Sequence, residues 1–349
     1  MTRKLATIRK INEIRPIEGA DAIEAAVVGG WTVVVKRGEF VAGDLAVYLE
    51  IDSWVPTELA PFLSKGSKPR EYNGVKGERL RTVKLRGTLS QGLLLSGTPC
   101  PTGLMVKQND SVMQHIFQEG DDVSEWLGIQ KWEAPIPAQL AGDVEGPFPT
   151  EVPKTDQERI QNLSETLKEW QDNSAFTWEV TEKLDGSSMT VFVNGDREGV
   201  CSRNWALKET AGNSLWHVAR REQLIEKIRS TGRNLALQGE IIGEGIQGNR
   251  YNVRGQEFHL FDIYDIDHGD YMTPFERRTF CDTHGIKYCP LIAVGMVIGE
   301  FVQGLLTMAE GKSMLNDKAE REGLVFKCNT FGGPSFKAIS NKFLLKSGE

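Results

Sequence analysis

Thr181-Glu-Lys-Leu-Asp-Gly-Ser-Ser188 lies between two segments in which apolar and polar residues alternate, 176–180 and 189–193. A period of two is typical of strands, so we expect this stretch to join two of them. Positions two apart on a strand end share a face, which would bring the ammonium of Lys183 and the carboxylate of Asp185 into one site. Taken alone, the same residues could form a surface turn with an ion pair.

The N-terminal part of the chain is rich in short β-branched and aromatic runs bounded by glycines. These runs predict strands over 31–36, 44–50, 80–85 and 92–96, and short strands at such spacing indicate a small barrel or sandwich. Prolines and glycines then recur between Pro99 and Pro153, as in a connector. We therefore expect one domain over 1–130 and a second over 131–349.

The second part mixes helices and strands. Thr155 followed by Glu158 three residues on fits a capping box and predicts a helix over Thr155–Asp172. The spacing of apolar residues predicts an amphipathic helix over Ser214–Ser230. Further strands are expected over 235–242, 258–264 and 323–327.

Composition excludes several classes of protein. A net charge of −7 argues against a protein that coats nucleic acid, although basic residues gather between Lys65 and Arg86. No apolar run reaches the roughly 20 residues of a membrane span, and no secretory signal precedes Ile8. The five cysteines form no CxxC pair, which disfavours a disulfide framework or a zinc site. We expect a cytoplasmic protein with reduced thiols.

One glycine-rich motif invites a different interpretation. Gly243-Glu-Gly-Ile-Gln-Gly248 matches the GxGxxG pattern of dinucleotide-binding folds. That pattern should open a helix, but the residues that follow, 249–254, have no helical apolar period. We do not expect a dinucleotide site there.

Other motifs follow the lysine stretch in a particular order. They are Ser202-Arg203-Asn204, Gly239-Glu240, Phe261-Asp262-Ile263, the run from Glu322 to Lys327, and Lys337. With Lys183-Leu-Asp-Gly186, this ordered set resembles the covalent nucleotidyltransferases, which include DNA ligases, RNA ligases and mRNA capping enzymes. The whole set is far more specific than any one of its members.

The resemblance implies a role for each matching residue. Lys183 would attack the α-phosphorus of ATP and carry AMP. A Mg²⁺ or Mn²⁺ ion would be held by Asp185, Glu240 and Glu322, whose hard oxygens suit it. ATP would be bound by Glu182, Arg203, Glu240, Phe261, Lys327 and Lys337, with Phe261 stacked on the adenine and the two lysines on the α-phosphate. Glu182 would accept a hydrogen bond from the adenine amine, or is simply a surface glutamate.

Lys183 needs activation in this chemistry. A free lysine has a pKa near 10.4 and is a poor nucleophile at neutral pH. Neighbouring cations lower such a pKa, so we expect Lys327 and Lys337, with a bound metal, to favour the neutral amine.

Two further stretches resemble RNA ligases in particular. Gly239-Glu-Ile-Ile-Gly-Glu-Gly-Ile-Gln247 is similar to a motif of the nick-sealing branch, and Lys154–Asn162 to the lead-in of ligases with an N-terminal OB domain. The implied fold is α+β, with an N-terminal OB-fold β-barrel followed by a nucleotidyltransferase domain of antiparallel sheets with flanking helices. The chain departs from the family at Ile339, where many nick-sealing ligases have a second lysine.

The expected partner is RNA, as a nicked duplex or a broken end. OB folds bind nucleic acid through basic grooves, so contacts are expected at Lys76, Arg79, Arg81 and Lys84, and also at Arg159. The basic stretch could equally be a solvated loop. No membrane and no obligate protein partner is expected. A DNA ligase, a GTP-using capping-type enzyme and a non-catalytic RNA-binding module stay open as alternatives.

Overall fold

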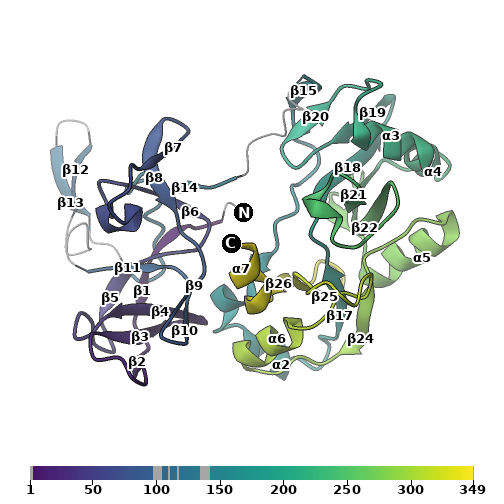
Figure 1. Cartoon of the computed structure of the whole chain (residues 1–349). Helices are drawn as coiled ribbons and strands as arrows, with labels where there is room; N and C mark the ends of the chain where they lie inside the picture. Colours follow the sequence, from purple (N-terminus) through teal and green to yellow (C-terminus); the bar gives the residue numbers. More distant parts are fainter. Residues whose placement is uncertain (1–2, 97–103, 109–110, 116–117, 134–141, 349) are drawn as a thin grey trace. The chain divides into compact units, whose positions relative to one another are not determined.

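The computed structural model describes residues 3–96, 104–108, 111–115, 118–133 and 142–348 (Figure 1). The chain divides into two compact units. The first comprises Met1–Ala134 with Gln161–Glu165 and Leu344–Glu349. The second comprises Pro135–Ile160 and Thr166–Phe343.

The first unit consists of small antiparallel sheets. Two three-stranded sheets have the orders β1-β5-β11 and β2-β3-β4, a four-stranded sheet has the order β14-β6-β8-β7, and β9-β10 and β12-β13 are hairpins. The strands are β1 (Ala6–Lys10), β2 (Glu13–Pro16), β3 (Ile23–Val28), β4 (Trp31–Lys36), β5 (Leu45–Leu49), β6 (Ser53–Pro56), β7 (Arg70–Tyr72), β8 (Val75–Arg79), β9 (Val83–Leu85), β10 (Thr88–Ser90), β11 (Leu93–Leu95), β12 (Leu104–Gln108), β13 (Ser111–His115) and β14 (Gln130–Lys131), with a 3-10 turn η1 (Pro61–Ser64).

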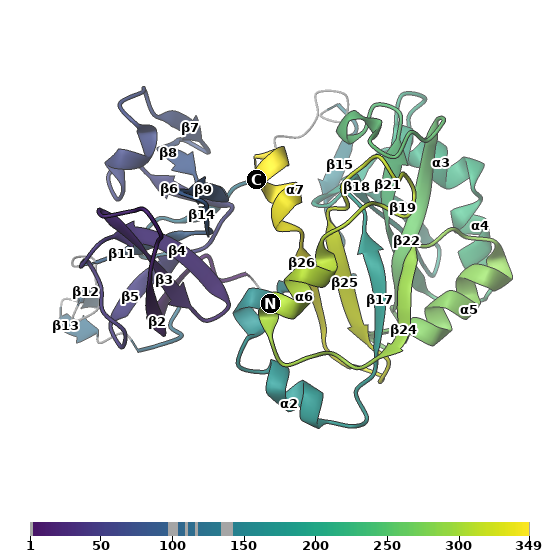
Figure 2. The same cartoon turned by 60° about the horizontal axis from the view of Figure 1, so that its bottom comes forward.

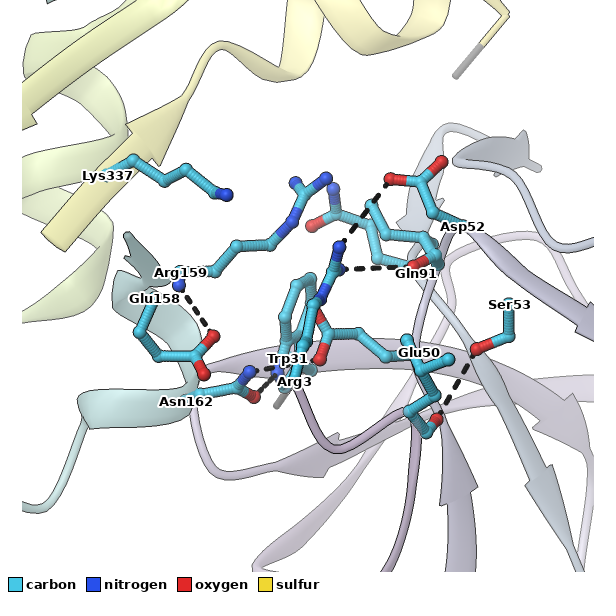
Figure 3. A network of polar contacts seen from close by, with 12 residues as sticks. Arg3, Trp31, Glu50, Asp52, Ser53, Gln91, Glu158, Arg159, Asn162 and Lys337 are labelled. Atoms are coloured by element: carbon cyan, nitrogen blue, oxygen red, sulfur yellow. Dashed lines mark hydrogen bonds and ion pairs between the residues drawn. The ribbon is translucent and has the colours of Figure 1, made fainter. Parts of the chain in front are cut away.

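Alternating side chains of these strands form the core of the first unit. Ile8, Val47, Leu49 and Val55 are among its buried members, as expected for strands with one face inward. The segment Gln161–Glu165 also belongs here. Its Asn162 side chain accepts from the Trp31 indole at 2.7 Å and donates to Glu50 at 3.0 Å (Figure 3).

The second unit contains two larger sheets. The seven-stranded sheet has the order β15-β20-β19-β18-β21-β22-β23, and the five-stranded sheet the order β16-β26-β25-β17-β24. The strands are β15 (Val144–Pro147), β16 (Glu158–Arg159), β17 (Trp178–Lys183), β18 (Ser187–Asn194), β19 (Arg197–Cys201), β20 (Trp205–Leu207), β21 (Leu235–Gly243), β22 (Gln256–Asp265), β23 (Asp270–Tyr271), β24 (Leu291–Met296), β25 (Gly323–Cys328) and β26 (Ser335–Ile339). Because β17 belongs to one sheet and β18 to the other, the loop Leu184–Gly186 leads from sheet to sheet.

Helices flank the sheets of the second unit, as Figure 2 shows. Three of them, α3 (Ser214–Arg221), α4 (Leu224–Arg229) and α5 (Pro274–His284), share one hydrophobic core with the seven-stranded sheet. The second unit also contains α2 (Leu167–Asp172), η3 (Gln247–Asn249) and α6 (Val302–Ala309). The segments η2 (Ile160–Leu163) and α7 (Asn341–Ser347) each contain residues of both units.

The predicted helix over Thr155–Asp172 is wrong. The backbone of Glu158 and Arg159 instead forms β16, which pairs in parallel with β26. The Glu158 carboxylate accepts from the Arg159 amide at 2.7 Å rather than closing a capping box. Within the predicted range, the α-helix covers only Leu167–Asp172, and a 3-10 turn covers Ile160–Leu163. Pairing with β26 takes up backbone groups of Glu158 and Arg159 that a helix would otherwise use.

The predicted helix over Ser214–Ser230 is broken into α3 and α4. Gln223 has a φ of 53°, a left-handed conformation that ends a helix. The apolar residues predicted to point inward are nevertheless buried, so the amphipathic pattern was correct on both sides of the break.

The predicted strands, connector and cysteines compare with the structure as follows. The strand expected over 31–36 is confirmed as β4, whereas only Val83–Leu85 of 80–85 forms a strand. The expected connector contains β15, a strand of the seven-stranded sheet, while its Pro135 and Pro137 lie outside the described residues. Cys201, Cys281, Cys289 and Cys328 are buried free thiols, and Cys100 lies outside the described residues. Among the described residues, no helix is long and apolar enough to cross a membrane.

Candidate active site

Lys183 ends β17 and lies beside a buried acid. Its Nζ is 2.5 Å from Glu322 Oε1. Sheet register explains the contact, because Lys183 pairs with Gly323, the residue after Glu322. A Cβ on Gly323 would lie 2.3 Å from the carbonyl oxygen of Ala338, so this close pairing requires glycine.

Two further acids adjoin the lysine. Glu240 lies on β21, and its Oε1 accepts from the Gly186 amide at 3.1 Å. Asp185 lies beyond the end of β17 and forms an ion pair with Arg250, at 3.0 Å between Oδ2 and Nη1. The structure places Asp185 on the loop after β17 rather than on a strand end, close enough for its charge to act on Lys183.

Acids dominate the electrostatics of Lys183. Burial alone would lower the pKa of its ammonium, but attraction to Glu322 and Glu240 outweighs burial and raises it. Burial, together with Glu322 and Asp185, raises the pKa of Glu240 to about 8 against the opposing effect of Lys183. The nearest charged partners of Lys183 are thus carboxylates rather than lysines, whereas the expected lowering of its pKa included a bound metal.

Glu182 is a buried residue, not the surface glutamate that the sequence left open. Its side chain is only 1% exposed. One oxygen, Oε2, accepts from the Met314 amide at 2.7 Å. The other, Oε1, has no hydrogen-bond partner among the described residues. A buried, unsatisfied acceptor costs free energy, so it fits a donor group of a ligand.

Phe261 and Lys327 belong to a second cluster of polar contacts, separate from the acids around Lys183. The Phe261 carbonyl accepts from Lys327 Nζ at 2.6 Å and from Arg277 Nη1 at 2.9 Å. Lys327 also forms an ion pair with Asp262. Lys327 pairs with Glu179 on β17. Glu179 precedes Lys183 by four residues, so the backbone positions of Lys327 and Lys183 are roughly 13 Å apart along the strand. Burial lowers the pKa of Lys327 to about 8, although Asp262 opposes that shift.

Lys337 and Arg203 share one acid. Asp156 Oδ1 is 2.9 Å from Lys337 Nζ, and Asp156 Oδ2 is 3.4 Å from Arg203 Nη2. Lys337 lies opposite Arg159 in the parallel β16–β26 pair, and Figure 3 shows its side chain. Asp156 therefore holds together two cations that the sequence assigned to ATP.

The position two residues after Lys337 does not carry a charge. Ile339 is buried and pairs with Gly323. Lys342, the next lysine along the chain, is 70% exposed, and its Nζ lies 3.8 Å from Glu310 Oε2.

The basic residues of the first unit differ in their surroundings. Arg79 forms an ion pair with Asp52 at 2.6 Å and stacks on Trp132, 3.9 Å from the ring centroid. Lys76, Arg81 and Lys84 are exposed. Arg79 is thus built into its unit, whereas the other three cations are accessible to solvent.

The acids near Lys183 offer carboxylate oxygens of the kind that bind divalent cations. Glu322 Oε2 is buried without a hydrogen-bond partner among the described residues, and the pKa of Glu322 is raised by burial and by Asp185. A cation relieves such repulsion. In the described part of the chain, no group of three or more His, Cys, Asp or Glu side chains is close enough to hold a metal ion.

Three residues of this site were not predicted. Tyr251 and Arg250 both contact Asp185, and they follow the GxGxxG stretch that we set aside. Asp156 lies in the lead-in segment. For Tyr251 and Arg250, the only indication in the sequence was a polar turn directly after a glycine-rich strand end.

Comparison with known families gives two matches. The RNA ligase family matches residues 176–339, and an OB-fold domain matches residues 5–97. The expected α+β fold, with its OB domain ahead of the catalytic sheets, is confirmed. No curated protein sequence matches the chain significantly.

Several solved structures match nearly the whole chain. A glutamate-to-alanine variant of Naegleria gruberi RNA ligase with AMP and manganese is 49% identical, with 98% of each chain covered and a TM-score of 0.87. A lysine-to-alanine variant with ATP and manganese has the same identity, coverage and TM-score. The same ligase with pyrophosphate is 49% identical over 98% of each chain, with a TM-score of 0.86.

Proposed function

The chain belongs to the RNA ligase family, and from that premise we propose that it seals nicks in RNA by way of AMP carried on Lys183. The observation that carries the proposal is the ammonium of Lys183, 2.5 Å from Glu322. Glu182 precedes Lys183 on β17, and its buried Oε1 has no hydrogen-bond partner among the described residues. A nucleophile and a base-reading acceptor thus occupy adjacent positions.

The first step is adenylyl transfer to Lys183. The ammonium gives up a proton to the solvent, and the neutral amine then attacks the α-phosphorus of ATP in line with the leaving group. A P–N bond forms, the bond from the α-phosphorus to the bridging oxygen breaks, and pyrophosphate leaves. Because Glu322 and Glu240 raise the pKa of Lys183, their charge opposes formation of the neutral amine. A bound divalent cation would supply the positive charge that offsets them and polarises the phosphates.

Glu182 and Phe261 would select the adenine. The free Oε1 of Glu182 accepts from the 6-amino group, a donor that guanine does not present at that position. Phe261 would stack on the base, and its backbone is held from behind by Lys327 and Arg277.

Lys337 and Arg203 would bind the phosphates. They are joined through Asp156, whose carboxylate a phosphate oxygen can replace with the same charge-assisted contacts. Lys327 would have to leave Asp262 to reach the α-phosphate. We therefore assign the main phosphate contact to Lys337 and the support of Phe261 to Lys327.

The remaining steps use RNA. AMP passes from Lys183 to the 5′-phosphate at the break, and the 3′-hydroxyl then attacks that phosphate and releases AMP. Exposed cations of the first unit, Lys76, Arg81 and Lys84, would bind phosphates of the duplex. Arg159, the further contact expected from the sequence, is buried, so we do not assign it to the duplex. The Gly239–Gln247 stretch, similar to nick-sealing ligases, supports a nicked duplex as the substrate.

Labelling with ATP tests the proposal. The protein is incubated with α-³²P-ATP, denatured and separated on a gel, with α-³²P-GTP in parallel. We expect ATP to label the parent protein and Lys287→Ala, a control at an exposed lysine, but not Lys183→Ala. The adduct should be stable in base and labile in acid, as a phosphoramidate is. A label that persists in Lys183→Ala would overturn the assignment.

A further inference from the structure

The turn after β21 has an unusual backbone. Gln247, Gly248, Asn249 and Asn252 have φ angles of 43°, 65°, 47° and 55°. Residues other than glycine rarely adopt this region, and clusters of them persist only where the surrounding structure fixes them. Here the Asn249 side chain fixes the turn, because it accepts from the Val253 amide at 3.0 Å and donates to the Val253 carbonyl at 2.9 Å.

This turn contacts the loop that follows the nucleophile. The Tyr251 hydroxyl accepts from the Asp185 amide at 2.6 Å. Arg250 Nη1 lies 3.0 Å from Asp185 Oδ2. Gln247 Nε2 donates to the Gly186 carbonyl at 3.4 Å. Backbone and side chain of the loop are therefore both held from the same short segment.

The loop itself leaves little space for other arrangements. A Cβ on Gly186 would lie 2.4 Å from the Ile241 carbonyl oxygen. The Gly186 amide donates to Glu240, so the conformation of Asp185 and Gly186 also sets where one of the metal-site acids lies.

Arg250 is fixed on three sides. Its guanidinium carbon is 4.6 Å from the centroid of the Phe343 ring, its carbonyl accepts from Asn316 Nδ2 at 2.7 Å, and its guanidinium pairs with Asp185. The side chain is 24% exposed, so the ion pair is partly shielded from water. The contact with Asp185 is an ion pair without a hydrogen bond, because Arg250 Nε and Nη1 are buried without a hydrogen-bond partner among the described residues.

We propose that Gln247–Tyr251 clamps the nucleophile loop and that Arg250 is a positioning residue for adenylyl transfer, acting through Asp185. Arg250 aims the Asp185 carboxylate and offsets one of the acidic charges around Lys183. The turn at the end of the GxGxxG motif would thus position the loop that follows Lys183. The catalytic half of this inference rests on the proposed function, whereas the structural half does not.

Hydrogen exchange tests the clamp without requiring catalysis. The amides of Asp185 and Gly186 are measured in the full-length protein without ATP. Arg250→Met removes the charge and keeps the length, Arg250→Lys restores the charge, and Arg254→Met is the matched control at an exposed arginine of the same segment. We expect exchange to accelerate about tenfold or more in Arg250→Met, as for local opening, and to stay near the parent rate in the other two variants. Unchanged exchange in Arg250→Met, or equal acceleration in Arg254→Met, would overturn the clamp.

Single-turnover adenylation tests the role in catalysis. We expect Arg250→Met to lower the rate at saturating ATP by about ten- to a hundredfold, the range for charged partners in contact, with the KM for ATP within about twofold and partial rescue by Arg250→Lys. In an Asp185→Asn protein, the additional change Arg250→Met should lower the adenylation rate by less than about twofold. Equal losses in both backgrounds would overturn action through Asp185. If adenylation by Asp185→Asn is too slow to measure, two other results would overturn action through Asp185. One is an Arg250→Lys rate no higher than that of Arg250→Met, and the other is an effect of Arg250→Met on the KM for ATP alone. A parent protein that takes no AMP refutes the proposed function, while hydrogen exchange still decides the clamp.

Discussion

Lys183, the proposed nucleophile, is surrounded by charges that oppose its activation. Lys183 lies 2.5 Å from Glu322, and acids raise its pKa despite burial. The ammonium is therefore stabilised in the resting site, and the neutral amine forms only when other positive charge compensates those acids. Sequence spacing indicated which residues would gather here. It could not indicate the balance between burial and attraction, because that depends on distances in the folded chain.

Glu182 offers a test of base selection. In Glu182→Gln, the Met314 amide still requires an acceptor, so the amide oxygen should remain there and the NH₂ group should replace the free Oε1. A donor then faces the adenine amine, and ATP labelling should fall by at least about tenfold. Labelling with GTP or ITP should rise relative to ATP, because their 6-oxygen accepts. An unchanged ratio of ATP to GTP labelling would show that Glu182 does not contact the base.

Glu240 offers a test of the electrostatics through stability. Its folded pKa of about 8 lies above the ordinary value of 4.5. Between these values the folded state binds a proton that the unfolded state does not, so stability falls as pH rises across this window. In EDTA, Glu240→Gln should therefore gain more than about 1 kcal/mol over the parent at pH 8.5 and little at pH 5. Urea unfolding at the two pH values measures this difference. A gain that does not depend on pH would contradict the raised pKa.

At the scale of elements, local patterns predicted strands better than helix ends. β4 and the alternating strands around Lys183 follow directly from their period of two. The helix expected from Thr155 failed, because Glu158 and Arg159 pair with β26, nearly 180 residues away along the chain and invisible to a local pattern. Gln223 broke a second helix with no glycine or proline to mark it. The clamp at Arg250 was missed for the same reason, since its partner Asp185 is distant in sequence.

The exposed cations near the β9–β10 hairpin test the binding of RNA. Replacing Lys76, Arg81 and Lys84 with alanine should weaken binding of nicked duplex RNA. The salt dependence of binding should also fall, by roughly one unit of slope for each phosphate that the variant no longer neutralises. Adenylation should be unchanged, because no RNA takes part in it. Arg79 is left intact, since its ion pair with Asp52 contributes to folding.

A second triple variant controls for net charge. Lys10, Lys36 and Arg37 are exposed cations of the same unit, and their replacement by alanine removes the same charge. Binding should stay near that of the parent protein. If both triple variants lose affinity equally, general attraction rather than this hairpin accounts for RNA binding.

At the scale of the whole molecule, the proposed chemistry lies in one unit. Lys183, Glu240, Glu322 and Lys337 all belong to the second unit, and the exposed cations belong to the first. The sequence predicted domains over 1–130 and 131–349. Spatial proximity assigns Gln161–Glu165 and Leu344–Glu349 to the first unit as well, an assignment that no composition change marks.

The most direct test of the central claim follows the fate of AMP on Lys183. The protein is charged with α-³²P-ATP, freed of nucleotide, and mixed with a nicked RNA duplex that carries a 5′-phosphate and a ribose 3′-hydroxyl at the break. We expect the label to leave the protein, pass through adenylylated RNA and end as free AMP, with one strand sealed for each AMP released. Label that stays on the protein while the nick remains open would contradict it.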